Sequence, residues 1–539
     1  MRDVLGAVLT DPPLRRVGLA YAGFNAAEWA VWIALLVYAY GHGGAPAASA
    51  AVVVQLIPAA IFAPFAARLA DHHAPARVLA GGYLAQSATM AATAAALAAG
   101  APPAVVLALA GAVSSAMTIT RPAQAAMVPA LVRTPDALTA TNVVLSWIES
   151  ISVCVAPAVT GVLLAISVPA TVFAVMSALA LASWTLVAGT GAAPAPSAEH
   201  RAGAVAEVLA GLAVVARDSQ ARLLSGVLGM QFVLIGALDV LFVVLAIDVL
   251  DLGGSGAGYL NAAFGAGGVI ALAVTIRLVG RRRLAPALVA AALGWSLAML
   301  VLGLWPTVVG AFTLLAAAGA ARALLDVAAR TLLQRSAPAG VLARVFGVLE
   351  TLDAIGLALG GVLAALLVAV LGPEAAVAGL AALMPLLLAL TWRGLRTADA
   401  RASVPIVEIA LLRSHALFSS LRAPVLERLA RELTAIAVPA GYCVIREGEP
   451  GRRYYVIADG QLEVTRSGLA VARVGRGDGV GEVSLLAGVP CTATVTALTA
   501  ARLYAIEPQT FFDVVGGHPT SAAAGRRLVG ERRQSPAST

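Results

Sequence analysis

The sequence predicts a polytopic α-helical membrane protein with two six-helix pseudo-repeats, twelve transmembrane helices in all, followed by a C-terminal α+β domain with a β-roll. Three observations predict this fold class. The 539-residue chain is 60% hydrophobic and 12% charged, whereas about a quarter of the residues of soluble domains are charged. Near-continuous apolar segments fill the chain up to about Trp392, after which polar and apolar residues alternate. The apolar part also repeats itself once along its length.

Twelve apolar segments are long enough to cross the hydrocarbon of a bilayer as helices, which takes about 20 residues. They are residues 17–41, 47–70, 77–100, 103–125, 137–166, 169–190, 222–250, 255–279, 284–304, 307–332, 341–370 and 374–392. No small-residue cleavage site follows the first segment, so we interpret it as a membrane helix and not as a removable signal peptide.

The loops between these segments alternate in their arginine content. Six of them, which we call the arginine-free loops, lie near 41–46, 100–103, 166–169, 250–254, 304–307 and 370–374. The other loops carry Arg68, Arg77, Arg133, Arg201, Arg217, Arg281 to Arg283, Arg335, Arg393 and Arg396. By the positive-inside rule the basic loops face the cytoplasm. We therefore expect both termini and the tail in the cytoplasm, and the protein in the cytoplasmic (inner) membrane.

All 36 basic side chains are arginine, and the net charge is +7. Because these arginines fall at helix ends and in the tail, and not along one stripe, they predict contact with membrane lipid and no nucleic-acid partner.

The two halves of the apolar part match each other at an offset of about 204 residues, which pairs Glu149 with Asp353. The predicted domains are a cytoplasmic N-terminus (1–16), an N-terminal six-helix half (17–190), a cytoplasmic connector (191–221), a C-terminal six-helix half (222–393), a basic linker (394–415), a β-roll domain (416–533) and a tail (534–539). Two such halves are typical of alternating-access transporters, whose substrate site lies near the midplane between the halves.

Residues 1–395 resemble the major facilitator superfamily. Between the second and third segments, ARLADHHAPAR keeps Asp71 and Arg77 of the family's signature, with alanine at positions 67 and 74. The glycine–proline pattern of antiporter members is half kept, as Ala156, Pro157, Thr160 and Gly161, with Gly356, Gly360 and Gly361 on the eleventh segment. The stretch PAQAAMVPALV is most similar to the branch of siderophore and macrolide exporters. The resemblance implies a secondary transporter, a proton-coupled exporter of a small or amphiphilic molecule.

Ionisable residues inside the predicted helices form the candidate site. Such a residue costs about 2.5–3.5 kcal/mol at the centre of a membrane helix, so it usually faces a cavity or a partner. The predicted substrate and proton residues are Glu28, Arg121, Glu149, Asp239, Arg322 and Asp326. The predicted conformational gate consists of Asp71, Arg77 and Asp353.

Four of the helices that carry this set line the central cavity in the superfamily, and Glu149 is expected on the neighbouring ring. Glu28 and Asp239 are the expected proton or cation-substrate carboxylates, with Arg121 or Arg322 as the switching counter-ion. The acidic cavity favours a cationic or zwitterionic amphiphile. The alternative is that Arg121–Glu149 and Arg322–Asp353 are structural ion pairs. Glu28 has no obvious local partner, and the nearby Trp29 and Trp32 are expected to be packing residues.

The tail changes at about Ala416 to short β-type runs with glycine turns, flanked by helical segments near 422–435 and 508–533. Its glycines, at 441, 448, 460, 475, 477 and 481, resemble in spacing those of the cyclic-nucleotide-binding domain. The resemblance implies a cyclic-nucleotide site at Gly481, Glu482, Val483, Ser484, Cys491 and Thr492. In that family the glutamate bonds the ribose 2′-hydroxyl. Cyclic AMP or cyclic GMP is then the candidate regulatory ligand.

One position departs from that family. The segment Pro-Arg-x-Ala-Thr reads here as Pro-Cys-Thr-Ala-Thr, so Cys491 replaces the phosphate-binding arginine. A hydrogen bond to a charged group contributes about 1.5–3 kcal/mol. Its loss is expected to weaken phosphate binding about tenfold to a hundredfold unless Arg446, Arg473 or Arg502 substitutes. Three interpretations stay open: an atypical cyclic-nucleotide site, a site for another ligand, and a ligand-free structural or interaction module.

Other classes of protein fit less well. No pore loop with a selectivity motif is present, which disfavours an ion channel. Without lysine there is no GxxxxGK[ST] loop, which disfavours an ATP-driven pump. The three cysteines have no metal-ligand spacing. We expect no catalytic residues, metal or cofactor, and so no enzyme. A membrane receptor on a transporter scaffold is the alternative to a transporter, and the oligomeric state is not predicted.

Overall fold

The computed structural model describes residues 11–132, 135–188, 212–213, 215–275, 283–336, 342–401, 406–419, 421, 423–516, 521, 523–525, 527 and 530. The chain divides into two compact units, Met1–Ala402 and Ser403–Thr539. Most of the predicted connector 191–221, with Arg201, lies outside the described residues, as do Arg133, Arg281 and Arg282.

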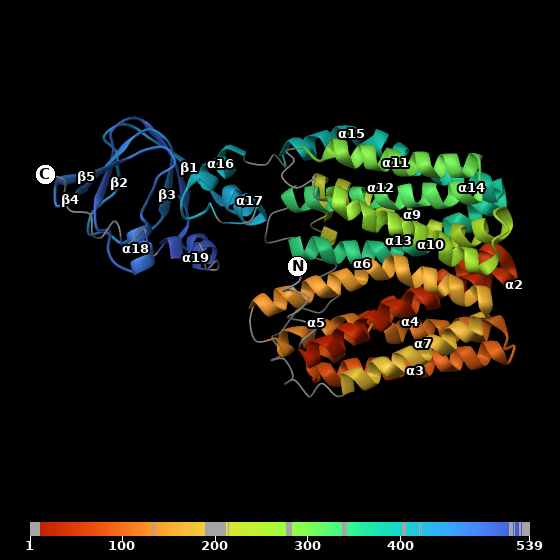
Figure 1. Ribbon diagram of the computed structural model, residues 1–539. Helices are drawn as coiled ribbons and strands as arrows, with labels where there is room; N and C mark the ends of the chain where they lie inside the picture. Colours follow the sequence, from red (N-terminus) through yellow and green to blue (C-terminus); the bar gives the residue numbers. More distant parts are fainter. Residues whose placement is uncertain are drawn as a thin grey trace. The chain divides into compact units, whose positions relative to one another are not determined.

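The first unit is a bundle of long helices in two groups (Figure 1). The first group consists of α2 (Pro12–His72), α3 (Pro75–Ala98), α4 (Pro103–Met117), α5 (Thr120–Leu131), α6 (Pro135–Ile166) and α7 (Pro169–Ala188). The second consists of α9 (Ser219–Val244), the π-helical turn η1 (Leu245–Val249), α10 (Gly253–Thr275), α11 (Ala285–Leu304), α12 (Val308–Ser336), α13 (Leu342–Leu371), α14 (Pro373–Leu380) and α15 (Leu383–Arg401). Most of these helices are apolar throughout, as expected where lipid cannot hydrogen-bond to a free backbone.

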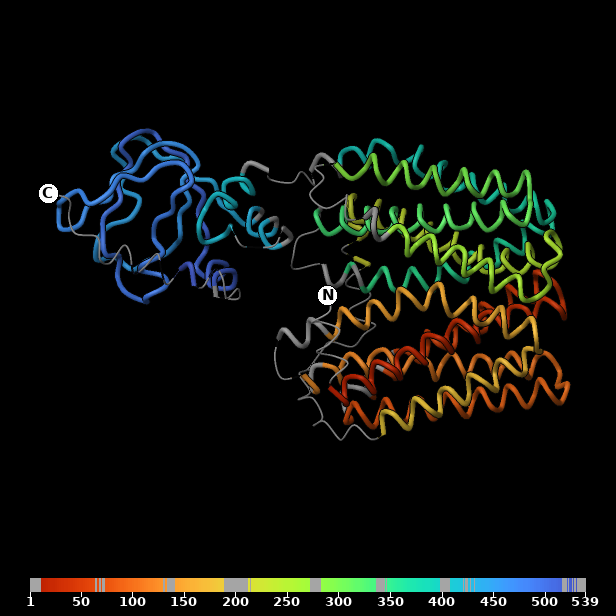
Figure 2. The backbone as a smooth tube through the Cα atoms, viewed as in Figure 1, coloured from red at the N-terminus to blue at the C-terminus, as the bar shows by residue number. Residues whose placement is uncertain are grey.

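Two glycines interrupt the 61-residue helix α2. Gly43 and Gly44 have non-helical dihedral angles, and Gly44 has a φ of +62°, which glycine adopts without strain. The break, visible where the backbone turns in Figure 2, separates two stretches that correspond to the predicted segments 17–41 and 47–70.

The predicted segment 103–125 lies within one candidate membrane span, Pro103–Val128, which a short interruption divides, because α4 ends at Met117 and α5 begins at Thr120. The Thr118 hydroxyl donates to the Ser115 carbonyl at 2.7 Å, in competition with the backbone. Pro122 has no N–H to bond to the Thr118 carbonyl, so it fits only in the first turn of a new helix.

In the described part of the chain, nine helical segments are long and apolar enough to cross a membrane. One of them, Pro12–Ala63, contains the break in α2. The count of twelve spans stays a prediction.

The two groups of helices approach closely where α6 packs against α10. A Cβ atom added at Gly258 would lie 2.6 Å from both the Gly161 nitrogen and the Pro157 carbonyl oxygen, so only glycine fits there. Both glycines lie in the helix halves nearest the arginine-free loops. At the same end of the bundle the Tyr40 hydroxyl, from α2, donates a hydrogen bond to Asp248 in η1. The halves are therefore in contact at the arginine-free end.

The second unit confirms the predicted β-roll with flanking helices. Its strands are β1 (Thr434–Val438), β2 (Cys443–Ile445), β3 (Tyr454–Asp459), β4 (Leu462–Arg466), β5 (Leu469–Val474), β6 (Gly479–Val480), β7 (Thr494–Ala497) and β8 (Ala501–Ile506). They form two antiparallel sheets in the orders β1-β8-β3-β6 and β2-β7-β4-β5. The helices are α16 (Ile406–Ser414), α17 (Ala423–Glu432), α18 (Glu482–Ala487) and α19 (Pro508–Gly516).

An aromatic cluster joins the helices of this unit to its sheets. The fully buried Tyr454 hydroxyl lies 2.8 Å from the His415 Nε2 atom, and its ring centroid is 4.8 Å from that of Phe511. A Cβ atom added at Gly479 would lie 1.8 Å from the Tyr454 hydroxyl oxygen. The small volume of Gly479 is therefore what allows β6 to pack over Tyr454.

Replacing Gly479 with alanine is expected to lower the free energy of unfolding of this unit by about 1–3 kcal/mol, the usual cost of overpacking a core. Hydrogen exchange of the β3 and β6 amides in the full-length protein measures this loss. Gly475→Ala is the matched control, because its added Cβ would lie 3.8 Å from the nearest atom, the Gly460 oxygen. Equal protection in the two variants would contradict the packing argument.

Candidate functional site

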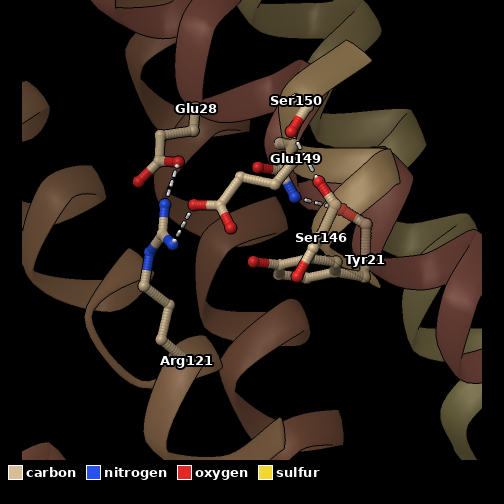
Figure 3. Close-up of polar contacts among 7 residues, drawn as sticks. Tyr21, Glu28, Arg121, Ser146, Glu149 and Ser150 are labelled. Atoms are coloured by element: carbon tan, nitrogen blue, oxygen red, sulfur yellow. Dashed lines mark hydrogen bonds and ion pairs between the residues drawn. The ribbon is translucent and has the colours of Figure 1, made fainter. Parts of the chain in front are cut away.

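Arg121, from α5, bridges two carboxylates in the first group of helices (Figure 3). Its Nη2 atom lies 2.9 Å from Glu28 Oε2 of α2, and its Nη1 atom lies 3.0 Å from Glu149 Oε1 of α6. We call these three residues the N-half cluster. The side chains are 37–49% exposed, so they face open space and not a sealed core.

This geometry adds to two expectations. Glu28 has no local partner in the sequence, but it has a distant one, Arg121, 93 residues away. Glu149, which was expected on the neighbouring ring of helices, contacts the same guanidinium. The expected Arg121–Glu149 pair is present, but it is one arm of a larger arrangement.

A cavity of about 450 Å³ adjoins the N-half cluster. Its polar lining residues are Tyr21, Arg121, Gln124, Asn142, Ser146 and Glu149. The Arg121 guanidinium also lies 5.7 Å from the centroid of the Phe24 ring, a cation–π distance. With two carboxylates and one guanidinium, the ionised cluster has a net charge of −1. The cavity is lined by Arg121 and Glu149, and Glu28 on the other arm of the guanidinium gives the adjoining cluster its one uncompensated negative charge.

The remaining charges of the predicted site gather in the second group of helices. Asp239, on α9, is 8% exposed, and the charges of Arg322 and Asp353 act on it. The Trp32 side chain of α2 lies close enough to this carboxylate to act on it. Arg322 lies 6.0 Å from the centroid of the Phe264 ring. The sequence predicted one cavity set, whereas the structure has two clusters, one in each half.

Asp326 has local partners. Arg330 Nε lies 3.0 Å from its carboxylate, and Gln231 Nε2 donates to it at 3.0 Å. The structure shows no ion pair between Arg322 and Asp353 in the part of the chain that it describes. The structural pairing expected for those two residues is therefore not present.

Trp32 is a contact that sequence reasoning missed. It lies four residues after Glu28, and residues at this spacing share one face of a helix. One face of α2 therefore contacts Arg121 through Glu28 and Asp239 through Trp32. The sequence shows the four-residue spacing of Glu28 and Trp32, but no pattern in it links Trp32 to Asp239, which lies 207 positions further on.

The predicted gate residues lie on three helices. Asp71 is near the end of α2, and its side chain lies outside the described part. Arg77 is exposed in the first turn of α3, and Asp353 lies half-buried on α13. The gate stays a prediction.

The tail holds a second cavity, of about 300 Å³, which we call the roll pocket. All six predicted residues line it: Gly481, Glu482, Val483, Ser484, Cys491 and Thr492. Gly481 has a φ of +103°, and a Cβ atom there would lie 2.7 Å from the Arg453 carbonyl oxygen, so this turn requires glycine. Glu482 is 1% exposed and Cys491 is 8% exposed. The chain thus brings the predicted residues together around one space.

The roll pocket also contains an arginine that was not among the residues predicted from the sequence. Arg466, at the end of β4, lines the pocket, whereas Arg446, Arg473 and Arg502 do not. Arg473 Nε instead lies 3.6 Å from Glu463 Oε1. No motif marks Arg466, but it lies two residues after Val464 and so on the same face of the strand.

Helix α16 is held to the roll by a polar contact. The Tyr504 hydroxyl of β8 donates to Glu408 Oε1 at 2.8 Å. Burial, and then the Glu408 carboxylate, raises the pKa of Tyr504. The phenol therefore stays protonated and can donate throughout the physiological range.

Comparisons with known proteins match both units. Residues 17–352 match the sequence model of the Major Facilitator Superfamily, and residues 435–518 match that of the cyclic nucleotide-binding domain.

Individual relatives match only a part of the chain. It is 34% identical over 122 residues to a cyclic nucleotide-gated potassium channel of Mesorhizobium japonicum, which covers 23% of this chain and 34% of that protein. It is 40% identical over 72 residues to a cGMP-dependent protein kinase of Caenorhabditis briggsae, covering 13% of this chain and 10% of that protein. The regulatory domain of Toxoplasma gondii PKA, solved with cAMP, matches at 31% identity and a TM-score of 0.21, over 23% of this chain and 47% of that one. The chain spans about a third of the channel and a tenth of the kinase.

Proposed function

Because this chain belongs to the Major Facilitator Superfamily and carries a cyclic nucleotide-binding domain, we propose that it is a secondary active transporter regulated through its tail. The family match and the apolar helices make it a multi-pass membrane protein. The proposal includes proton-coupled export, twelve spans, an inner-membrane location and cytoplasmic termini. The arginine-free loops support this orientation.

The N-half cluster carries the proposal. A guanidinium favours the ionised form of Glu28, whereas protonation of the carboxylate or the arrival of a cationic group would weaken its bond to Arg121. Either event changes the attraction between α2 and α5. Alternating access requires such a change to occur on binding, near the space between the two halves.

The charge and shape of the cavity support a class of substrate. The net charge of −1 on the cluster, the Tyr21 ring and the apolar side chains at the wall suit a small cationic or zwitterionic amphiphile. Between the halves, Trp32 of α2 lies beside Asp239 of α9, and this second contact could respond to the same bound cation.

The close packing of Gly161 against Gly258 supports the proposal of transport by alternating access. The two halves are in contact at the arginine-free end, so opening at that end requires α6 and α10 to separate. In alternating access, two rigid groups of helices usually rock against each other, so that the contacts between them form and break in turn.

For the tail, the roll pocket supports binding of a cyclic nucleotide. The names of the relatives link their function to cyclic nucleotides, and all six predicted residues surround the pocket in this chain. A ligand-free module is the second candidate, favoured by the cysteine at position 491.

Transport and its regulation are testable in sealed vesicles that contain the purified protein, with a fluorescent cationic dye and a pH gradient. We expect dye movement that depends on the gradient. We also expect it to change about fivefold or more when cyclic AMP or cyclic GMP is added on the side of the tail, since allosteric coupling is typically 1–3 kcal/mol.

The matched control is a chain that ends at Arg401, which should still move the dye but lose the response. Dye movement that ignores both nucleotides and the truncation would favour a ligand-free tail. The absence of any dye movement would favour a receptor on a transporter scaffold.

A further inference from the structure

The roll pocket lacks the arginine that its family uses for phosphate. Cys491 lies buried in that place. A thiol supplies neither the permanent positive charge nor the paired N–H donors of a guanidinium. An anionic ligand in this pocket therefore needs a cation from another element.

Strand pairing brings such a cation to the same place. Strand β4 pairs antiparallel with β7, with Val464 opposite Val495 and Thr465 opposite Thr494. The next pair in this register would join Arg466 and Ala493, two residues after Cys491. Because side chains alternate along a strand, Arg466 shares its face with Val464, and both line the pocket.

Two hydrogen bonds fix the end of β4 against the start of β7. The Ser467 N–H donates to Glu447 Oε2 at 2.8 Å, and the Glu447 N–H donates to Thr494 Oγ1 at 3.0 Å. Glu447, which follows β2, therefore links Ser467, the residue after Arg466, to Thr494, the first residue of β7. This arrangement orders the backbone that presents the guanidinium.

The pocket lining divides by chemistry. Arg466 is the cation and Glu482 the anion among its lining residues, with hydroxyls at Ser484 and Thr492. The other walls are mainly aliphatic, from Ile445, Val464, Val471, Val474, Val480 and Val495. A ligand with one anionic group, a free hydroxyl group and a flat ring system matches this lining, and a cyclic nucleotide has all three.

We infer that Arg466 binds the cyclic phosphate, in place of the family arginine whose position Cys491 occupies. The inference rests on the proposed binding of cyclic nucleotide by the tail. It assigns the anion-binding role to the end of β4, a different element from the segment after α18.

Isothermal titration of the purified full-length protein with cyclic AMP tests this assignment, with adenosine as the uncharged probe. In Arg466→Gln the affinity for cyclic AMP should fall about tenfold to a hundredfold, the value of a hydrogen bond to a charged group. The affinity for adenosine should stay within about twofold of the wild type, because adenosine has no phosphate. Cys491→Arg in the Arg466→Gln background should restore binding of cyclic AMP.

Arg473→Gln is the matched control. Its side chain is 72% exposed and pairs with Glu463 on the adjacent strand, outside the pocket lining, so its loss should leave both affinities unchanged. Circular dichroism of each variant checks that the tail is folded.

The outcomes separate the inference from the proposed function. Wild-type protein that binds no cyclic nucleotide would overturn both. Wild-type protein that binds cyclic AMP, with equal affinity in Arg466→Gln, would overturn the role of Arg466 alone. Equal losses for cyclic AMP and adenosine would also overturn it, since the residue would then act on the shape of the pocket and not on the phosphate.

Discussion

Glu28→Gln is expected to abolish dye transport driven by a pH gradient while leaving the protein inserted in the membrane. The amide oxygen of glutamine can still accept a hydrogen bond from Arg121 Nη2, so the helices keep their contact. The side chain can no longer take up or release a proton, and the net charge of the N-half cluster changes from −1 to 0. We expect the gradient-driven rate in sealed vesicles to fall about 100-fold or more, which is the usual contribution of a positioned proton-transfer group.

Two further variants sharpen this experiment. Glu374→Gln removes an exposed carboxylate from the first turn of α14 and should transport normally. Glu149→Gln makes the same change of charge on the other arm of Arg121. If Glu149→Gln lost transport and Glu28→Gln did not, Glu149 would be the proton-binding residue. Normal gradient-driven transport in Glu28→Gln would reject the assignment.

Gly258→Ala is expected to produce the second large effect, a loss of transport caused by steric separation of the two halves. The added Cβ would lie 2.6 Å from backbone atoms of Gly161 and Pro157, and backbone cannot rotate away as a side chain can. The two helices must therefore move apart at the arginine-free end. Transport should fall about tenfold or more, since packed interfaces have discrete arrangements and do not deform continuously.

Spin labels measure the separation directly. Cysteines at Ser167 and Leu252, in the loops 166–169 and 250–254, would report a longer distance in Gly258→Ala than in the parent protein. Gly226→Ala is the matched control on α9, where an added Cβ meets no atom within 4 Å. An unchanged distance together with normal transport would contradict the proposed contact.

The features that depend on local composition were predictable from the sequence. Apolar segments predicted the helices, and short β-type runs with glycine turns predicted the β-roll. Both signals are local, because hydropathy and the conformational freedom of glycine act over a few residues. The break between α4 and α5 was missed, because it depends on Thr118 bonding to its own helix and on the missing N–H of Pro122. A hydropathy pattern contains neither effect.

The candidate residues were predictable, but most of their partners were not. Glu28 and Arg121 each stood out as charges in apolar segments, yet their contact joins helices that no sequence pattern pairs. In the tail, the family resemblance predicted six pocket residues. Arg466 was not predicted, because its place in the pocket depends on the register in which β4 pairs with β7. Long-range packing decides such contacts, and a single sequence does not encode it in a readable pattern.

Glu28 and Trp32 lie one turn apart on α2, and each contacts a charge in a different half of the bundle. A helix moves as a rigid unit, so one displacement acts on both contacts. This arrangement limits how the protein can diverge. Substitutions at the apolar walls of the cavity, such as Ala125 and Val128, can alter substrate range one at a time. A substitution that shifts α2 must instead be compatible with Arg121 and Asp239 together.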